Sequence, residues 1–179
     1  MNNTLKKILP ITLLIWPYLC ILPFWAGSIN ESLYSPGIGI YAALTVVVYV
    51  MNIINACLYK GEDAYYRLAF WNMLMKLMHI PFYLIVFLLG ILFLLASVVP
   101  ALVFVTPFMI LMLVAIDLFL MITSSLYGMN ALIRACKRRL VSKIYTVVQI
   151  ILHCFFVTDV ISAVMVYFKL RKALVNKQK

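Results

Sequence analysis

Long apolar runs, separated by short polar or proline-containing stretches, fill most of this chain. The clearest is residues 80–127, whose one charged residue is Asp117 and which is interrupted midway at Pro100 and Pro107. A bilayer-spanning helix needs about 20 predominantly apolar residues, so this stretch predicts two consecutive spans joined by an uncharged turn. The same reasoning along the chain predicts spans at residues 8–26, 38–59, 80–99, 103–127 and 144–168.

Residues 62–79 carry a different pattern. Polar or small side chains recur at helical spacing along one face, at Tyr65, Ala69, Asn72, Lys76 and His79. This periodicity predicts an amphipathic helix, which we expect to lie in the membrane interface with its polar face toward water. On this interpretation His79 is solvated and Pro81 marks the turn into the next span. A single long helix kinked at Pro81 is the alternative.

The first and last apolar runs each leave two interpretations open. The first follows Lys6 and Lys7 as a signal peptide would, but its prolines favour a retained, kinked span, followed by a loop at residues 27–37. The last, residues 144–168, either crosses the membrane or forms a re-entrant or interfacial segment. Gln149 and His153 lie on one side of its helical wheel and Thr158 and Ser162 nearly opposite, whereas an interfacial helix has one polar face, so we favour a fifth span.

These elements predict one integral membrane domain, residues 1–179. Its fold class is all-α, a polytopic transmembrane helix bundle of four or five spans with one amphipathic interfacial helix. The composition agrees, because 66% of the residues are hydrophobic and only 11% are charged, far from the balance of a soluble domain.

The basic residues predict the orientation of the chain. With the N-terminus in the cytoplasm, every Lys and Arg before residue 144 lies in an inward-facing segment, as the positive-inside rule requires. A fifth span would place the basic tail outside, against that rule. We expect a multi-pass plasma-membrane protein, and the small size and short loops favour a bacterial inner membrane. The net charge of +10 does not indicate nucleic-acid binding, because the basic residues sit on no separate folded module.

Two sets of residues are candidates for function. A basic cluster beside a span predicts contact with anionic lipids, through Arg134, Lys137, Arg138, Arg139 and Lys143. The second set is polar and lies within the apolar runs: Asn52, Asn55, Asp117, His153 and Asp159.

The intramembrane set allows structural and functional interpretations. An ionisable side chain inside a bilayer is unfavourable by about 2.5–3.5 kcal/mol on insertion scales, so Asp117 is a functional candidate, with a hydrogen-bonded structural aspartate as the alternative. Asp117 and His153 have similar expected depths, which suggests that they share a proton. We expect Asp159 nearer the outer surface and solvated. Asn52 and Asn55 either hydrogen-bond across helices or line a polar cavity.

Catalytic and cofactor signatures are missing from the sequence. It contains no GxxxxGK[ST] or GxGxxG motif, no CxxC pair, and too few histidines for a conventional zinc site. We therefore expect a non-enzymatic protein without cofactor or metal. The favoured function is an accessory or interaction component that contacts lipids and either a second copy or a membrane-protein partner. The alternative is a small transporter, channel or transport subunit that uses the intramembrane polar residues.

Overall fold

The computed structural model of the protein describes residues 3–61, 63–153 and 155–178, and every regular element in this part of the chain is helical. In chain order the elements are α1 (Asn3–Ile15), η1 (Trp16–Cys20), α2 (Ile21–Ile29), η2 (Glu31–Leu33), α3 (Tyr34–Leu58), α4 (Ala64–Ala96), α5 (Thr106–Lys137), α6 (Lys143–Leu152) and α7 (Phe156–Gln178). Four helical stretches among the described residues are long and apolar enough to cross a membrane: Lys6–Ile29, Glu31–Leu58, Ala64–Ala96 and Thr106–Lys137. The predicted all-α transmembrane bundle is confirmed.

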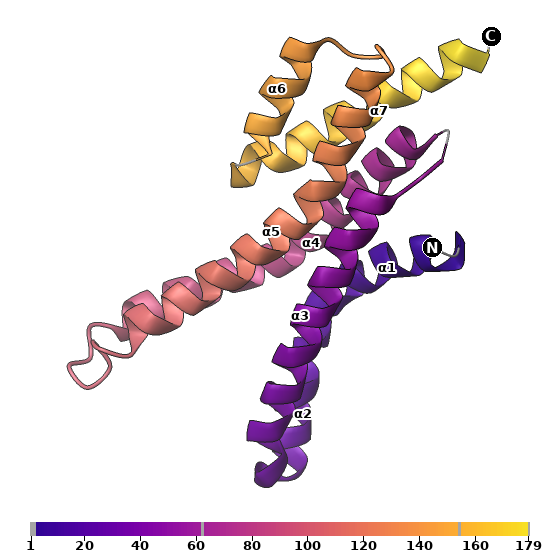
Figure 1. Cartoon of the computed structure of the whole chain (residues 1–179). Coiled ribbons are helices and arrows are strands. Elements are labelled where there is room, and N and C mark those ends of the chain that lie inside the picture. Colours follow the sequence, from indigo (N-terminus) through magenta and orange to yellow (C-terminus); the bar gives the residue numbers. More distant parts are fainter. Residues whose placement is uncertain (1–2, 62, 154, 179) are drawn as a thin grey trace.

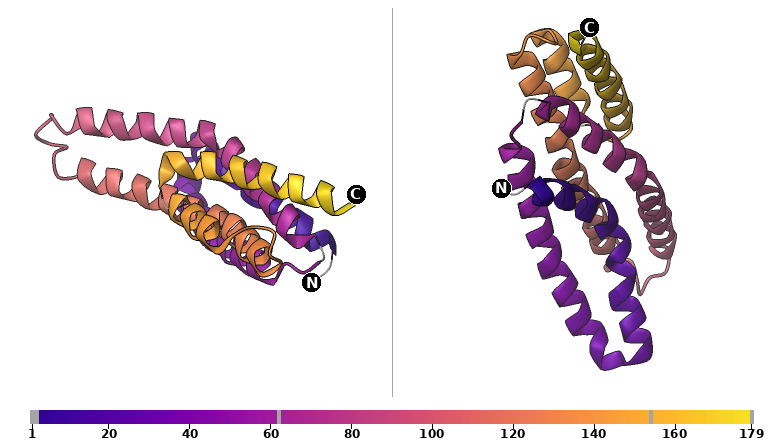
Figure 2. Two further views of the ribbon diagram at one scale, coloured as in Figure 1. Left: turned by 90° about the horizontal axis from the view of Figure 1, so that it is seen from above. Right: turned by 90° about the vertical axis from the view of Figure 1, so that its right-hand side faces the viewer.

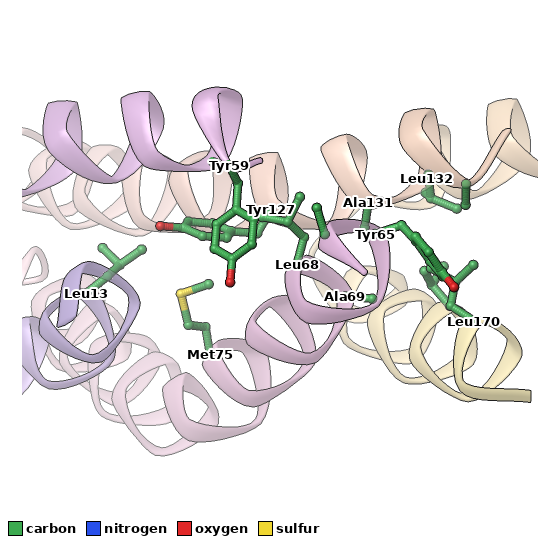
Figure 3. Packing of buried hydrophobic residues seen from close by; sticks show 14 of the residues in the cluster. Leu13, Tyr59, Tyr65, Leu68, Ala69, Met75, Tyr127, Ala131, Leu132 and Leu170 are labelled. Carbon is green, nitrogen blue, oxygen red and sulfur yellow. The ribbon is translucent and has the colours of Figure 1, made fainter. Parts of the chain in front are cut away.

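The helices form two long hairpins and a shorter one. The hairpin of α1, α2 and α3 and the hairpin of α4 and α5 diverge toward the same end of the molecule, where their tips lie apart (Figure 1). Both termini lie toward the opposite end of the molecule (Figure 2). The α6–α7 hairpin folds back onto this end, where α7 packs on α4 and α5. The core lies at this junction, with contributions from α1, α4, α5 and α7 that include Leu13, Leu68, Tyr127 and Leu170 (Figure 3).

The first span is kinked where its prolines predict. Pro17 lies in the 3₁₀ turn η1, between α1 and α2, because a proline lacks the N–H that would continue an α-helix. Trp16 anchors this turn to α3, donating from Nε1 to Thr45 Oγ1 at 2.8 Å and accepting from the Tyr41 hydroxyl at 3.0 Å. The loop expected at residues 27–37 is much shorter, because α2 continues to Ile29 and the Asn30 side chain accepts from the Ser32 N–H at 3.1 Å to start the next helical turn.

The separate interfacial helix expected at residues 62–79 is absent, because α4 runs without interruption from Ala64 to Ala96 and includes Pro81. The stripe that was expected to face water is buried between helices. His79, expected to be solvated, is 0% exposed, with Nε2 3.2 Å from the carbonyl oxygen of Leu13. Tyr18 donates to the carbonyl of Met78 in the turn before the proline. Contacts from α1 and η1 thus lie directly before Pro81 in the continuous helix that the alternative described.

The continuous fifth span expected at residues 144–168 is also absent. Helix α6 has ten residues, about 15 Å, and cannot cross an apolar layer of about 30 Å. The chain then reverses into α7, which carries the charged residues Asp159, Lys169, Arg171, Lys172 and Lys177. The two polar sides of the predicted wheel belong to two helices that face each other, with Ser162 Oγ donating to Gln149 Oε1 at 2.5 Å. A hairpin replaces the single span, which agrees with the alternative of a re-entrant or interfacial segment (Figure 1).

Candidate functional site

A buried ion pair joins α4 to the α6–α7 hairpin. The ammonium of Lys76 donates to the carboxylate of Asp159, and the two side chains are 1% and 2% exposed. Nδ1 of His153 lies 2.6 Å from the other carboxylate oxygen of Asp159. An unpaired charge in such a position would be strongly unfavourable, so each of these groups depends on the others for burial.

Helix α5 contributes further hydrogen bonds to this ion pair. Lys76 Nζ donates to Ser125 Oγ at 2.8 Å and to the carbonyl of Met121 at 3.1 Å. Ser125 Oγ in turn lies 3.2 Å from Asp159 Oδ2. The three ammonium hydrogens therefore have three acceptors, on α5 and α7. We refer to Lys76, Ser125, His153 and Asp159 as the charge cluster.

Two buried groups beside the charge cluster have no hydrogen-bond partner within the described part of the chain: Nε2 of His153 and both polar atoms of the Asn72 amide. Both side chains approach Gly128 of α5, where a Cβ atom would lie only 2.7 Å from His153 Nε2 and closer still to the Asn72 amide. The absence of a side chain at Gly128 thus lets an imidazole and an amide meet against α5. Together they can donate to and accept from a proton carrier or a small polar solute.

Asn52 and Asn55 form a second network, with Tyr127. Asn55 Nδ2 donates to the Tyr127 hydroxyl at 3.0 Å, which donates to Asn52 Oδ1 at 2.8 Å. All three residues are buried. The network links α3 to α5 through cross-helix hydrogen bonds, which is one of the two arrangements expected for these asparagines.

We expect Tyr127→Phe to destabilise the protein by about 1–3 kcal/mol, because it removes the partner of two buried amide atoms, Asn52 Oδ1 and Asn55 Nδ2. Tyr66→Phe is the matched control: its hydroxyl lies 3.2 Å from that of Tyr167 in a partly buried position, so its loss should have a smaller effect. Thermal unfolding in mild detergent compares the two variants. An equal or smaller decrease in Tm for Tyr127→Phe would contradict the proposed importance of the network.

The predicted pairing of Asp117 with His153 is wrong, because His153 pairs with Asp159. Asp117 is half-buried on α5, with Tyr49 of α3 and Tyr83 of α4 within electrostatic range. Asp159 is 1% exposed rather than solvated. Both errors follow from treating residues 144–168 as one helix, since the reversal before α7 brings residue 159 back beside residue 153.

The basic cluster divides into two groups. Arg134 Nη2 donates to the carbonyl of Cys57 at 2.9 Å, at the end of α3, and the Arg138 guanidinium lies 5.4 Å from the ring centroid of Tyr65. Those two residues hold helices together. Lys137, Arg139 and Lys143 instead line a surface pocket.

Lys76, Asn72, Ser125 and Gly128 were not among the predicted site residues. Lys76 and Asn72 belong to the polar stripe predicted for residues 62–79, but that stripe was expected to face water. The described residues contain no group of three His, Cys, Asp or Glu side chains placed to hold a metal ion. The groups that the site offers are a carboxylate, an imidazole, an ammonium, a hydroxyl and an amide.

The sequence of the chain matches one known protein family. Residues 4–172 match the model of a family of unknown function, DUF6652. The chain belongs to this family. No curated protein and no solved structure matches it. In this DUF6652 member the matched region contains the whole charge cluster, and the family description specifies no ligand or reaction, so function has to be inferred from the site.

Proposed function

We propose that this multi-pass helical membrane protein is a small proton-linked transporter or transport subunit whose working site is the charge cluster. The observation that carries the proposal is the burial of Lys76 and Asp159, bridged to His153, where the α6–α7 hairpin packs on the two long apolar helices α4 and α5. A buried ion pair rarely stabilises a fold more than apolar side chains of the same volume would. Ionisable groups retained inside membrane segments commonly mark ion or proton pathways.

Asp117 supports a route from the buried cluster toward a partly exposed position on α5. Tyr83 lies within electrostatic range of both Asp117 and Asp159. Asp117 is partly exposed, whereas the cluster is buried. A polar side chain near both acids favours proton movement between them, with no bond to carbon made or broken, and the protein acts without enzymatic catalysis in this proposal.

The proposed orientation has the N-terminus in the cytoplasm of a bacterial cell, in the plasma membrane. Because α7 returns toward the end where α6 begins (Figure 1), the basic tail lies on the same side as the other basic segments. The re-entrant hairpin thus removes the exception to the positive-inside rule that a fifth span would create.

An accessory role through helix contacts is the second candidate. Of the four stretches able to cross a membrane, Glu31–Leu58 is the least buried within the chain. Its open faces favour contact with a second copy or with another membrane protein, in addition to lipid.

Reconstitution into vesicles tests the transport proposal. We expect vesicles containing the full chain to dissipate an imposed pH gradient faster than protein-free vesicles, and Lys76→Met/Asp159→Leu to return the rate to the protein-free level. Tyr66→Phe, which leaves the cluster intact, should transport like the unsubstituted protein. If the full chain does not differ from protein-free vesicles, proton transport by this chain alone is excluded, and a stoichiometric partner in mild-detergent purification would then favour the accessory role.

A further inference from the structure

A pocket of about 390 Å³ lies where α5 ends and α6 begins, lined by Ile133, Cys136, Lys137, Arg139, Lys143 and Thr146. Half of these residues are cationic. Within the described part of the chain, none of the three cations forms an ion pair, since the ion pairs found there involve Lys76 and His153. The pocket therefore concentrates positive charge without a negative side chain to balance it. A bound anion would provide that negative charge.

The backbone at Arg139 gives a second, independent observation. Helix α5 ends in a Schellman motif, in which the Leu140 N–H donates to the carbonyl of Ala135 at 3.0 Å and the Arg139 N–H donates to that of Cys136 at 2.9 Å. This motif places Arg139 in the left-handed region, with φ of 59°. Glycine is the residue that this position usually takes, because it carries no Cβ. An arginine held in an unfavourable conformation at the rim of a cationic pocket points to a role in binding.

The pocket also borders the first turn of α6. Ser142 caps this helix, accepting from the Tyr145 N–H at 3.2 Å, and Lys143 is its first residue. The N-terminal end of a helix favours anions through its free N–H groups and its dipole. Arg134 and Arg138 are engaged elsewhere, so the charge at this pocket is distinct from the general excess of basic residues.

We propose that Lys137, Arg139 and Lys143 bind a phosphate group, which a guanidinium and two ammonium groups can share by charge-assisted hydrogen bonds. The phosphate belongs either to an anionic lipid headgroup or to a soluble phosphate, and both present the same charged oxygens. Ile133 and Cys136 on the lining add apolar surface, which an acyl chain can cover. The site is separate from the charge cluster and does not depend on the transport proposal.

Arg139→Gly is the most discriminating variant, because it removes one cation while relieving the left-handed backbone. We expect the full chain in neutral detergent to bind phosphatidylglycerol at one saturable site by native mass spectrometry. Arg139→Gly should weaken that binding about tenfold, the loss expected for one charge-assisted contact, with an unchanged or higher Tm. Lys172→Gln, an exposed residue of α7 with the same change in charge, should leave binding within about twofold.

The two phosphate sources are separated by competition. If millimolar inorganic phosphate displaces the lipid from the full chain, the site takes soluble phosphate; if it does not, the site takes the lipid headgroup. Either result supports a phosphate site, provided that Arg139→Gly is impaired. Equal binding by Arg139→Gly and the unsubstituted chain, or an equal loss in Lys172→Gln, would overturn the proposal in favour of diffuse charge attraction.

Discussion

Replacing Lys76 with methionine will destabilise the protein by about 3–5 kcal/mol, the range observed when one partner of a buried ion pair is removed. The substitution nearly preserves the volume but removes the ammonium that donates to Asp159. It leaves the Asp159 carboxylate, on a side chain that is 2% exposed, with His153 and Ser125 as its remaining side-chain partners among the described residues. Equilibrium unfolding in mixed micelles measures the loss.

The double variant Lys76→Met/Asp159→Leu separates charge from packing. Apolar side chains of similar volume often replace a buried ion pair without loss, so most of the stability should return. Lys60→Met is the control for removing an exposed lysine and should change the free energy of unfolding by less than about 0.5 kcal/mol. If Lys76→Met behaves like Lys60→Met, or if the double variant is as unstable as the two single losses combined, the ion pair is not coupled as described.

The four spans could be predicted because uninterrupted apolar length alone decides whether a helix can cross a bilayer. The assignment of residues 62–79 to a separate interfacial helix was wrong, although the sequence contains evidence against it. The stripe through Asn72, Lys76 and His79 continues in helical phase at Tyr83 and Val86, which are also buried. A helical face that continues in phase across Pro81 indicates one continuous helix. It also indicates that this face is buried rather than exposed to water.

The α6–α7 hairpin could not be found by local rules. The residues between Leu152 and Phe156 include neither glycine nor proline, so propensity gives no reason for the chain to turn there. The reversal is stabilised by tertiary contacts instead, chiefly the pairing of Asp159 with Lys76 on α4. A helical wheel drawn through the turn placed Gln149 and Ser162 far apart, although they are hydrogen-bonded.

For a related reason, the sequence did not show which acidic residue lies beside Lys76. A lysine buried in an apolar helix requires an acidic partner, and the apolar runs contain two, Asp117 and Asp159. Depth along straight helices favoured Asp117 as the functional acid. Only the hairpin geometry brings Asp159 to Lys76, which is why Asp159 and His153 were recognised as candidates but their pairing was not.

Gly128→Ala gives the last test of how the cluster is packed. Its Cβ would lie 2.7 Å from His153 Nε2 and would also overlap the Asn72 amide, and both side chains are enclosed between α4, α5 and the hairpin. We expect a loss of about 1–3 kcal/mol from overpacking, together with slower proton flux, because His153 must move away from α5.

Gly90→Ala is its matched control, since a Cβ there meets nothing within 4 Å. Replacing that helical glycine should leave stability unchanged or raise it by about 0.4–1 kcal/mol, through the lower entropy of the unfolded chain. Both substitutions change helix propensity in the same way. A loss of stability at Gly128 but not at Gly90 would therefore report the contact of the new Cβ with His153 and Asn72. If Gly128→Ala stabilises the protein as Gly90→Ala does, the His153 imidazole and the Asn72 amide do not meet against α5.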